Sequence, residues 1–179
     1  AVYYYASNNL IAMLVQTIDL HFLNAAEAIA AYLIPTENGA ALVECGPHST
    51  LPQLIAGLQQ HGYQPEDIHT LFLTHIHFDH AGAAWWFAQR GTNVYVHPRG
   101  YKHLLAPKRL YESARMIYQD KMDQLWGKML PIAEGQLTAV EDGAIISANG
   151  LKMTAIHSPG HAVHHISWHT GEILFTGDV

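Results

Sequence analysis

The chain has 179 residues, enough for one domain with a hydrophobic core, and 49 % of its residues are apolar while 13 % are charged. It contains no run of about 18 consecutive apolar residues that would predict a membrane-spanning helix, and its net charge of −6 disfavours a nucleic-acid surface, which needs clustered Lys and Arg. The single cysteine, Cys45, excludes an internal disulfide, fits a reducing cytoplasm and is expected to be a small buried side chain.

The first 12 residues carry no charge and show no pattern of a helix or strand. Residues 1–12 are therefore expected to be an upstream or non-native leader, with Met13 as a natural start. A signal peptide is the alternative, but no basic stretch precedes the apolar residues. The domain is accordingly expected to span residues 13–179.

Strand-like and helical segments alternate through the first hundred residues. Ser49 and Thr50 can cap the first helix, and Pro52 lies in its first turn. The predicted segments are strands at 10–18, 28–34, 40–43, 68–73 and 93–96 and helices at 51–60 and 81–89. This alternation implies an α/β sandwich.

Residues 106–130 show apolar side chains at three- or four-residue spacing. The pattern predicts one amphipathic helix that begins after Pro107 and ends near Gly127. This helix either simply covers the sheet or forms a lid over an apolar substrate pocket. In the second case the pocket would be shaped by Tyr111, Met116, Tyr118 and Trp126.

The last third of the chain contains predicted strands at 151–156, 166–168 and 172–174. Glycine-containing turns follow the first and the last of them, and such turns bring the backbone close to a bound group. The first turn, Ser-Pro-Gly-His-Ala, contains His161, and the second, Phe-Thr-Gly-Asp, contains Asp178.

Residues 74–80 read Thr-His-Ile-His-Phe-Asp-His, directly after the predicted strand 68–73. Alternate residues of an extended stretch point the same way, so His75, His77 and Asp79 can converge, while His80 can face a second metal. Histidine is the commonest metal ligand, and zinc favours nitrogen and carboxylate oxygen. The alternative is a histidine-rich surface loop without a metal.

These features together resemble the metallo-β-lactamase superfamily of metallo-hydrolases. The resemblance extends from about Ile18 onward and includes Gly39 and the run 44–46. It implies an αββα sandwich of two similar halves, with metals at one edge. The family usually has one further His ligand on a later strand. Because the chain stops at Val179, we expect a C-terminally incomplete domain whose unpaired sheet edge favours instability or association into a homo-oligomer.

The resemblance also implies a role for each matching residue. The matching ligands are His75, His77 and His161 for the first metal, Asp79 and His80 for the second, and Asp178 between the two. Asp79 would in addition orient a hydroxide and shuttle a proton. His165 and Glu44 are expected to support the ligands through hydrogen bonds, although many relatives carry Asp at the position of Glu44 and a plain structural role for His165 is the alternative.

The expected reaction is hydrolysis of an ester-like bond in a small molecule, a thioester or a lactone, by a hydroxide that bridges two divalent metal ions. Zinc is the first choice, with iron or manganese as alternatives, and it lowers the pKa of bound water from 15.7 to about 7. No Gly-x-Ser-x-Gly elbow indicates a serine nucleophile. His77 distinguishes the chain from oxygen-reducing diiron relatives, which carry Glu there.

Three other functions remain open. A mononuclear iron persulfide dioxygenase would use His75, His77 and His161 alone, a phosphodiesterase or nuclease shares the motif, and a non-catalytic binding domain could keep the fold. Antibiotic hydrolysis is less favoured, and no nucleic-acid or membrane partner is expected. The other histidines without a motif are expected on the surface or in the core: His21, His48, His69, His97 and His103.

Overall fold

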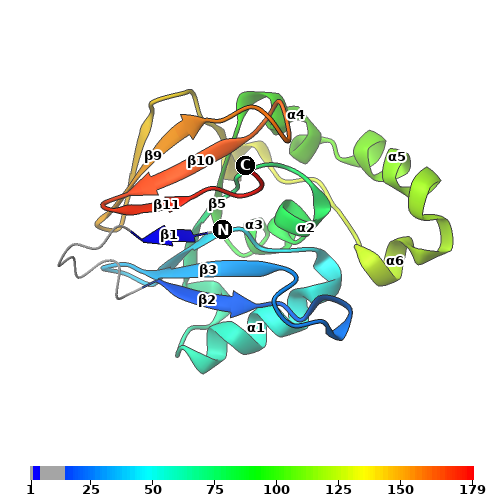
Figure 1. Ribbon diagram of the computed structural model, residues 1–179, viewed down its shortest axis with the longest axis horizontal. Helices are drawn as coiled ribbons and strands as arrows, with labels where there is room; N and C mark the ends of the chain where they lie inside the picture. The colour runs from blue at the N-terminus through cyan, green and yellow to red at the C-terminus, as the bar shows by residue number, and fades with distance from the viewer. Residues whose placement is uncertain (1, 5–14) are drawn as a thin grey trace.

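The computed structural model describes residues 2–4 and 15–179, and two β-sheets packed face to face form its centre (Figure 1). The six-stranded sheet consists, in spatial order, of β2 (Gln16–Asp19), β3 (Ala30–Pro35), β4 (Ala40–Val43), β5 (Ile68–Phe72), β6 (Asn93–Val96) and β7 (Leu137–Ala139). The five-stranded sheet consists of β1 (Val2–Tyr4), β11 (Ile173–Phe175), β10 (Ile166–Thr170), β9 (Leu151–His157) and β8 (Ile145–Ala148). The α/β sandwich predicted from the sequence is confirmed.

The helices are short and lie outside the two packed sheets. The α-helices are α1 (Leu51–Gln60), α2 (Phe78–Ala81), α3 (Ala84–Ala88), α4 (Pro98–Leu105), α5 (Lys108–Tyr118) and α6 (Met122–Leu125). The 3₁₀ turns are η1 (Phe22–Asn24), η2 (His48–Thr50), η3 (Pro65–Asp67), η4 (Gln119–Lys121) and η5 (Glu134–Gln136). Helix α1 lies beside β2 and β3, whereas α5 and α6 extend away from the sheets (Figure 1). None of the helices in the described ranges is long and apolar enough to cross a bilayer.

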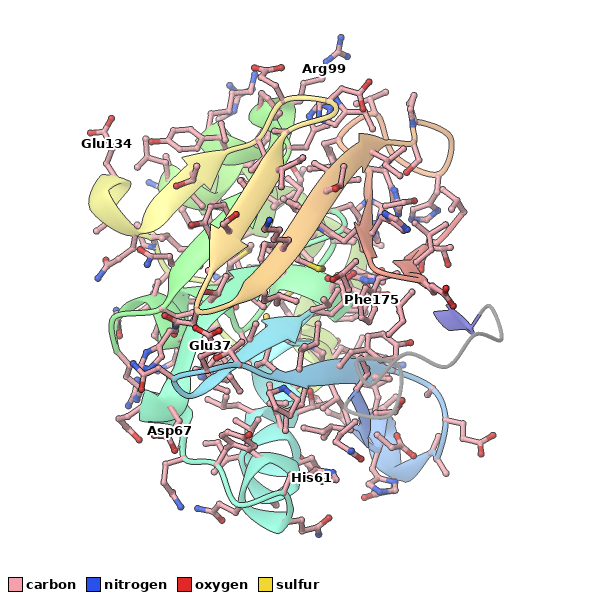
Figure 2. The ribbon with its side chains drawn as sticks, turned by 90° about the vertical axis from the view of Figure 1, so that its left-hand side faces the viewer. Glu37, His61, Asp67, Arg99, Glu134 and Phe175 are labelled. Atoms are coloured by element: carbon pink, nitrogen blue, oxygen red, sulfur yellow. The ribbon has the colours of Figure 1, made fainter. Side chains whose placement is uncertain are left out.

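Two hydrophobic cores hold the layers together, because successive residues of the central strands point to opposite faces. On β5, Leu71 packs between the sheet and the helices, while Phe72 packs between the two sheets. The ring of Phe72 lies 4.9 Å from that of Trp168 on β10, and both side chains are fully buried. Phe175 also lies between the sheets, whereas Glu134 lies at the periphery (Figure 2). Complete burial of one such apolar side chain stabilises the fold by about 1.5–3 kcal/mol.

The parallel part of the six-stranded sheet creates the edge at which the polar residues gather. Strands β4, β5 and β6 run parallel, with Leu42 opposite Leu71 and Leu71 opposite Val94. Helix α1 makes the crossover from β4 to β5. The carboxyl ends of these strands therefore lie side by side, and ligands of open α/β sheets bind at such ends.

Several element boundaries agree with the sequence-based predictions, and two local predictions are wrong. The helix at 51–60 and the strands at 40–43 and 93–96 have the predicted bounds. The predicted helix 81–89 is shorter, because only α3 (Ala84–Ala88) falls within it, whereas Ala81 ends the earlier helix α2. Gly82 between the two helices lies close to the backbone of Pro47. Thr50 does not cap α1 with its side chain, because its hydroxyl donates to the carbonyl of Pro47 at 3.0 Å.

The single long helix predicted for residues 106–130 is also wrong. Helix α5 ends at Tyr118, and the chain turns at Gln119, whose φ of 48° is left-handed, before α6 begins. The turn buries Met122 but leaves Ile117, which the periodicity placed on the apolar face, 74 % exposed. Packing of Met122 in the core overrides the local helical pattern. Strands β7 and β8 and helix α4 were not predicted.

The five-stranded sheet ends on one side at β1 among the described residues. Strand β1 pairs antiparallel with β11, with Val2 opposite Phe175, so the edge lies one strand beyond β11. Apart from these β1 residues, the expected leader at 1–12, the proposed start at Met13 and most of the predicted strand 10–18 lie outside the described residues. Self-association remains a prediction.

Candidate metal centre

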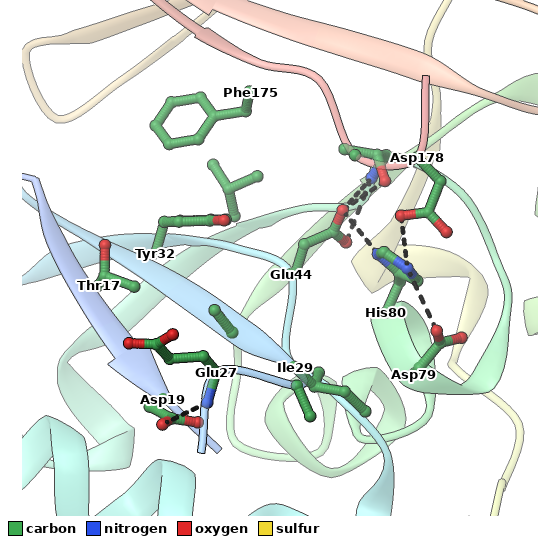
Figure 3. Close-up of a pocket in the computed structure, with 15 residues that line it drawn as sticks. Thr17, Asp19, Glu27, Ile29, Tyr32, Glu44, Asp79, His80, Phe175 and Asp178 are labelled. Atoms are coloured by element: carbon green, nitrogen blue, oxygen red, sulfur yellow. Dashed lines mark hydrogen bonds and ion pairs between the residues drawn. The ribbon is translucent and has the colours of Figure 1, made fainter. Parts of the chain in front are cut away.

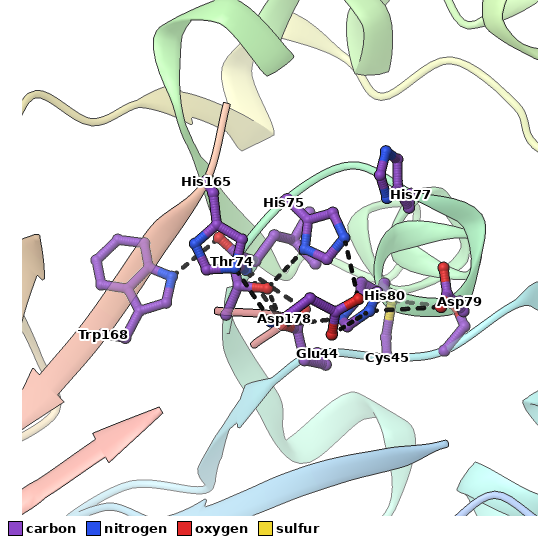
Figure 4. Close-up of polar contacts among 12 residues, drawn as sticks. Glu44, Cys45, Thr74, His75, His77, Asp79, His80, His165, Trp168 and Asp178 are labelled. Carbon is purple, nitrogen blue, oxygen red and sulfur yellow. Dashed lines mark hydrogen bonds and ion pairs between the residues drawn. The ribbon is translucent and has the colours of Figure 1, made fainter. Parts of the chain in front are cut away.

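Three segments that are far apart in the sequence meet at the carboxyl end of β5 (Figure 4). Residues 74–77 leave β5, and α2 begins at Phe78. The loop 158–165 connects β9 to β10, and residues 176–178 follow β11. The backbone N–H of Ile166 donates to the carbonyl of Thr74 at 2.8 Å, which connects the first two segments directly.

The first group of polar side chains consists of His75, His77 and His161, with one nitrogen of each within 4.8 Å of the others. Nε2 of His161 lies 3.0 Å from Nδ1 of His77. Two nitrogens at this separation can both reach one cation at the Zn–N distance of about 2.0–2.1 Å. His75 is fully buried, whereas His161 is partly open to solvent.

The second group consists of Asp79, His80 and Asp178. Nε2 of His80 lies 3.5 Å from Oδ2 of Asp79 and 3.4 Å from Oδ1 of Asp178. The other oxygen of Asp178, Oδ2, lies 3.4 Å from Nε2 of His161 and 4.0 Å from Nε2 of His75. Asp178 therefore lies between the two groups, with one oxygen toward each.

A buried carboxylate lies behind both groups. Glu44 follows β4 and is 3 % exposed, and its Oε1 lies 3.2 Å from Nδ1 of His80. The hydroxyl and the backbone N–H of Thr74 both donate to this carboxylate. Oγ1 of Thr74 is also 3.0 Å from Nδ1 of His75. Thr74 belongs to the 74–80 run, but its contact with Glu44 spans 30 residues and no sequence pattern indicates it.

His165 connects the β9–β10 loop to the turn that contains Asp178. Its Nε2 accepts a hydrogen bond from the backbone N–H of Asp178 at 3.3 Å, and its Nδ1 lies 2.9 Å from Oγ of Ser158. Gly177 lies against the same imidazole, and a Cβ there would come within 2.6 Å of His165 Nε2 and of Thr74 Oγ1. The role of Ser158 was not anticipated, although it begins the Ser-Pro-Gly-His turn.

Burial and neighbouring charges shift the pKa values of these groups in different directions. Burial, reinforced by the nearby imidazoles of His80 and His77, lowers the pKa of His75 far below its usual value. Burial also lowers the pKa of His77, with His161 as the next cause. Burial alone would lower the pKa of His80, but the carboxylates of Glu44 and Asp79 outweigh it and raise that pKa to about 10. The acidic groups around His80 therefore favour a positive charge at this point.

The donor set fits a divalent cation. Nε2 of His75 is buried and has no hydrogen-bond partner among the described residues. A buried nitrogen left unpaired costs about 1–3 kcal/mol, so an ion at this position would remove a real penalty. A cation would also supply the charge that the carboxylates favour at His80, in place of a proton. Imidazole nitrogen and carboxylate oxygen suit zinc, iron and manganese alike.

A cavity of about 470 Å³ opens beside the second group (Figure 3). Glu44, Asp79, His80 and Asp178 line one side of it, and β2 and β3 line the other. The backbone N–H of Glu27 donates to Asp19 at 2.9 Å and holds the loop between these two strands at the cavity.

The other histidines that lacked a motif do not join either group. Nδ1 of His97 accepts a hydrogen bond from the backbone N–H of Arg99 at 3.0 Å and caps α4. His48 stacks on Trp85 with ring centroids 5.1 Å apart. Cys45 is buried as expected, and burial raises the pKa of its thiol well above the usual value.

Comparison with protein families gives one match over most of the chain: the model described as "Metallo-beta-lactamase superfamily" matches residues 25–179. A "Metallo-beta-lactamase fold-containing protein ST1585" of Sulfurisphaera tokodaii is 31 % identical over 112 residues, which cover 60 % of this chain and 43 % of that protein. A "Hydroxyacylglutathione hydrolase" of Aeromonas hydrophila is 29 % identical over 147 residues, covering 82 % of this chain and 44 % of that protein. The chain thus spans less than half the length of these two relatives.

Solved structures share the fold. The native FEZ-1 metallo-beta-lactamase from Legionella gormanii superposes with a TM-score of 0.67 at 20 % sequence identity. The alignment covers 87 % of this chain and 54 % of that one. At this level of identity the likeness concerns the fold and not the substrate.

Proposed function

The chain belongs to the metallo-beta-lactamase superfamily of metal-dependent hydrolases, and we propose that it forms the metal-binding part of a hydrolase that cleaves thioesters or lactones. Two divalent ions, zinc in the first instance, would be held by the two groups described above. His75, His77 and His161 would bind the first ion, Asp79 and His80 the second, and Asp178 both.

One observation carries the proposal. The buried Nε2 of His75 has no hydrogen-bond partner in the described part of the chain, although it lies among nitrogen and oxygen ligands. His161, Asp79 and Asp178 are each more than one third exposed on their side chains, which leaves room for water and a substrate. A catalytic zinc site keeps such an open place, whereas a structural site is closed.

When bound, the ions would lower the pKa of water to about 7 and polarise the attacked carbonyl group. Asp79 supplies the proton transfer. Burial alone would raise the pKa of its carboxyl group, but contact with the His80 imidazole outweighs this and lowers it, so the group is ionised at neutral pH. It accepts a proton of the attacking water as the new carbon–oxygen bond forms. It then returns the proton to the sulfur or oxygen that leaves when the old bond breaks.

The thioester is the first substrate class to test. Support comes from the relatives, of which two from Aeromonas and one from Haemophilus influenzae carry the name hydroxyacylglutathione hydrolase at 27–29 % identity. Lactones present the same carbonyl chemistry with an oxygen leaving group. A small-molecule substrate of this kind also agrees with the net charge of −6, which does not favour a nucleic acid.

The test combines metal analysis with a substrate panel. The purified chain is loaded with zinc, its metal content is measured by mass spectrometry, and hydrolysis of acyl-glutathione thioesters and of lactones is followed. His75→Ala should lose most of its metal and its activity, and Asp79→Asn should lose activity. His61→Gln, at an exposed histidine that directly follows α1 and belongs to neither donor group, is the matched control and should behave as the native chain.

Two outcomes would overturn the proposal. Failure of the native chain to bind zinc, manganese or iron would remove the metal site altogether. Binding of one iron with oxygen uptake on a persulfide, and no hydrolysis of any ester, would favour the dioxygenase instead.

A further inference from the structure

A second cavity, of about 880 Å³, lies between helix α1, helix α3 and the loop that follows α6. Its volume falls in the range of about 300–1,000 Å³ that is typical of small-molecule sites. It shares no lining residue with the cavity beside the metal centre, and none of its lining residues belongs to either donor group. A ligand of this cavity would therefore be separate from the hydrolysed substrate.

The loop after α6, residues 125–128, forms one wall of the cavity, and side chains from other elements hold it. The hydroxyl of Ser49 donates to the carbonyl of Leu125 at 2.6 Å, and the indole N–H of Trp85 donates to the carbonyl of Lys128 at 3.0 Å. The wall is thus fixed before a ligand arrives. A preformed wall reduces the ordering entropy that binding has to overcome.

The wall formed by α1 and α3 is apolar. Leu51, Pro52 and Ile55 of α1 and Trp86 of α3 line it. Pro52 is exposed, and Ile55 is only partly buried against the core. An apolar ligand would remove this surface from water, and each CH₂ group that it buries would strengthen binding by up to about four-fold.

Two nitrogens at the rim of the cavity are free to donate to a ligand. Lys128 is exposed, and its ammonium group forms no ion pair within the described ranges. The backbone N–H of Lys128 donates to Nδ1 of His48 at 3.4 Å, so the neutral His48 ring carries its proton on Nε2. Burial, followed by the nearby Lys128 ammonium group, lowers the pKa of His48, which keeps the ring neutral at pH 7.

The charges around the cavity favour an anionic ligand. Asp123 is the single acidic residue of the lining, and its carboxylate already accepts a hydrogen bond from the hydroxyl of Tyr111 at 3.4 Å. The positive charge of Lys128 has no such partner. A carboxylate could accept hydrogen bonds from Lys128 and His48 together, and hydrogen bonds between charged groups are about twice as strong as neutral ones.

We propose that this cavity binds a small carboxylic acid with an apolar body. The carboxylate lies at Lys128 and His48, and the apolar body lies against Leu51, Ile55 and Trp86. Binding requires neither a metal ion nor hydrolysis, so this proposal goes beyond the proposed function and can be tested independently of it.

The test uses octanoate as the probe and isothermal titration calorimetry of the complete 179-residue chain at pH 7. No metal is added, so that the carboxylate does not bind at the metal centre. Octanoate should bind more tightly than butanoate, by up to about four-fold for each additional CH₂ group. Octanoate should also bind about five-fold more tightly than octylammonium, which has the same chain and the opposite charge.

A charge reversal tests the role of Lys128. Lys128→Glu should reverse the preference, so that octylammonium binds more tightly than octanoate. Lys102→Glu is the matched control, because it changes the net charge equally at an exposed lysine of α4 that does not line the cavity. This control should keep the native preference. Circular dichroism checks that each variant folds, and the comparison of octanoate with octylammonium on the native chain does not depend on any variant.

Nuclear magnetic resonance locates the bound probe. Octanoate should shift the methyl signals of Ile55 and the indole N–H signal of Trp86, and it should leave the indole signal of Trp168, which is buried between the two sheets, unchanged.

Four results would overturn the proposal. They are failure of the folded native chain to bind octanoate, equal affinity for butanoate and octanoate, tighter binding of octylammonium by the native chain, and an unchanged preference in folded Lys128→Glu. Shifts at the metal-centre histidines without shifts at Ile55 and Trp86 would place the probe elsewhere and would also overturn it.

Discussion

Replacing Gly177 by alanine should destabilise the fold and disturb the metal centre together. Gly177 has a φ of +56°, and a Cβ at this position would lie 2.6 Å from Nε2 of His165 and 2.6 Å from Oγ1 of Thr74. Neither neighbour can move freely, because Ser158 holds His165 and Glu44 holds Thr74. The left-handed backbone costs alanine about 1–2 kcal/mol, and overpacking adds about 1–3 kcal/mol. The free energy of unfolding should therefore fall by about 2–5 kcal/mol.

Gly62→Ala provides the matched control. Gly62 also has a left-handed backbone, with a φ of +84°, but nothing lies within 4 Å of a Cβ placed there. This variant should lose only the backbone part, about 1–2 kcal/mol. The assay is urea unfolding of the metal-free chains, followed by zinc titration. Gly177→Ala should also bind zinc more weakly, because Asp178 is the next residue, whereas Gly62→Ala should not. Equal losses of stability in the two variants would refute the argument from close packing.

Three further predictions concern other parts of the molecule. Trp126, whose ring stacks on that of Phe22 with centroids 5.5 Å apart, tests whether residues 106–130 form a lid over the substrate. Trp126→Ala should change the relative kcat/KM values across the substrate panel more than it changes the metal content. Equal loss of both would mean that Trp126 only packs in the fold. Burial, together with His157 and Arg99, lowers the pKa of His97, so the Nδ1 that caps α4 is unprotonated at neutral pH. The contribution of this cap to the free energy of unfolding is lost as the pH falls below the unfolded pKa of about 6.5. His97→Asn keeps a capping acceptor and cannot titrate. Between pH 7 and pH 5, its free energy of unfolding, measured with urea, should fall by about 1 kcal/mol less than that of the native chain. Identical decreases would contradict this. Removal of zinc by a chelator should lower the free energy of unfolding by about 3–4 kcal/mol if the free zinc concentration was 100–1,000 times Kd before removal. Added zinc should restore the original value. An unchanged free energy of unfolding would mean that zinc does not bind the folded state.

Local sequence patterns predicted the elements whose structure depends mainly on neighbouring residues. The helix 51–60 and the strand 93–96 have the predicted bounds, because a proline in the first helical turn and short apolar runs act over a few positions. Residues 106–130 show where such patterns fail. Their helical periodicity is real, but burial of Met122 and the left-handed turn at Gln119 divide the helix, and both depend on packing against the rest of the fold.

The candidate metal centre also combines residues that local spacing predicts with residues that it does not. The spacing within residues 74–80 already indicated that His75 and His77 lie on one side, since an extended chain alternates its side chains. The additions of His161 and Asp178 came from family resemblance, because no local pattern relates segments about 80 to 100 residues apart. Their distances, such as 3.4 Å between His161 and Asp178, agree with that expectation.

By itself, the sequence determined that this chain forms an α/β sandwich with a histidine- and aspartate-rich run after a buried strand, because hydrophobic alternation and ligand spacing are properties of adjacent residues. Only the tertiary structure decided that Glu44 faces both His75, through Thr74, and His80, and that the two oxygens of Asp178 face different groups. These contacts arise because parallel pairing of β4 with β5 and the packing of the second sheet bring distant loops to one edge. Such pairing depends on the whole core, and no short stretch of the chain encodes it.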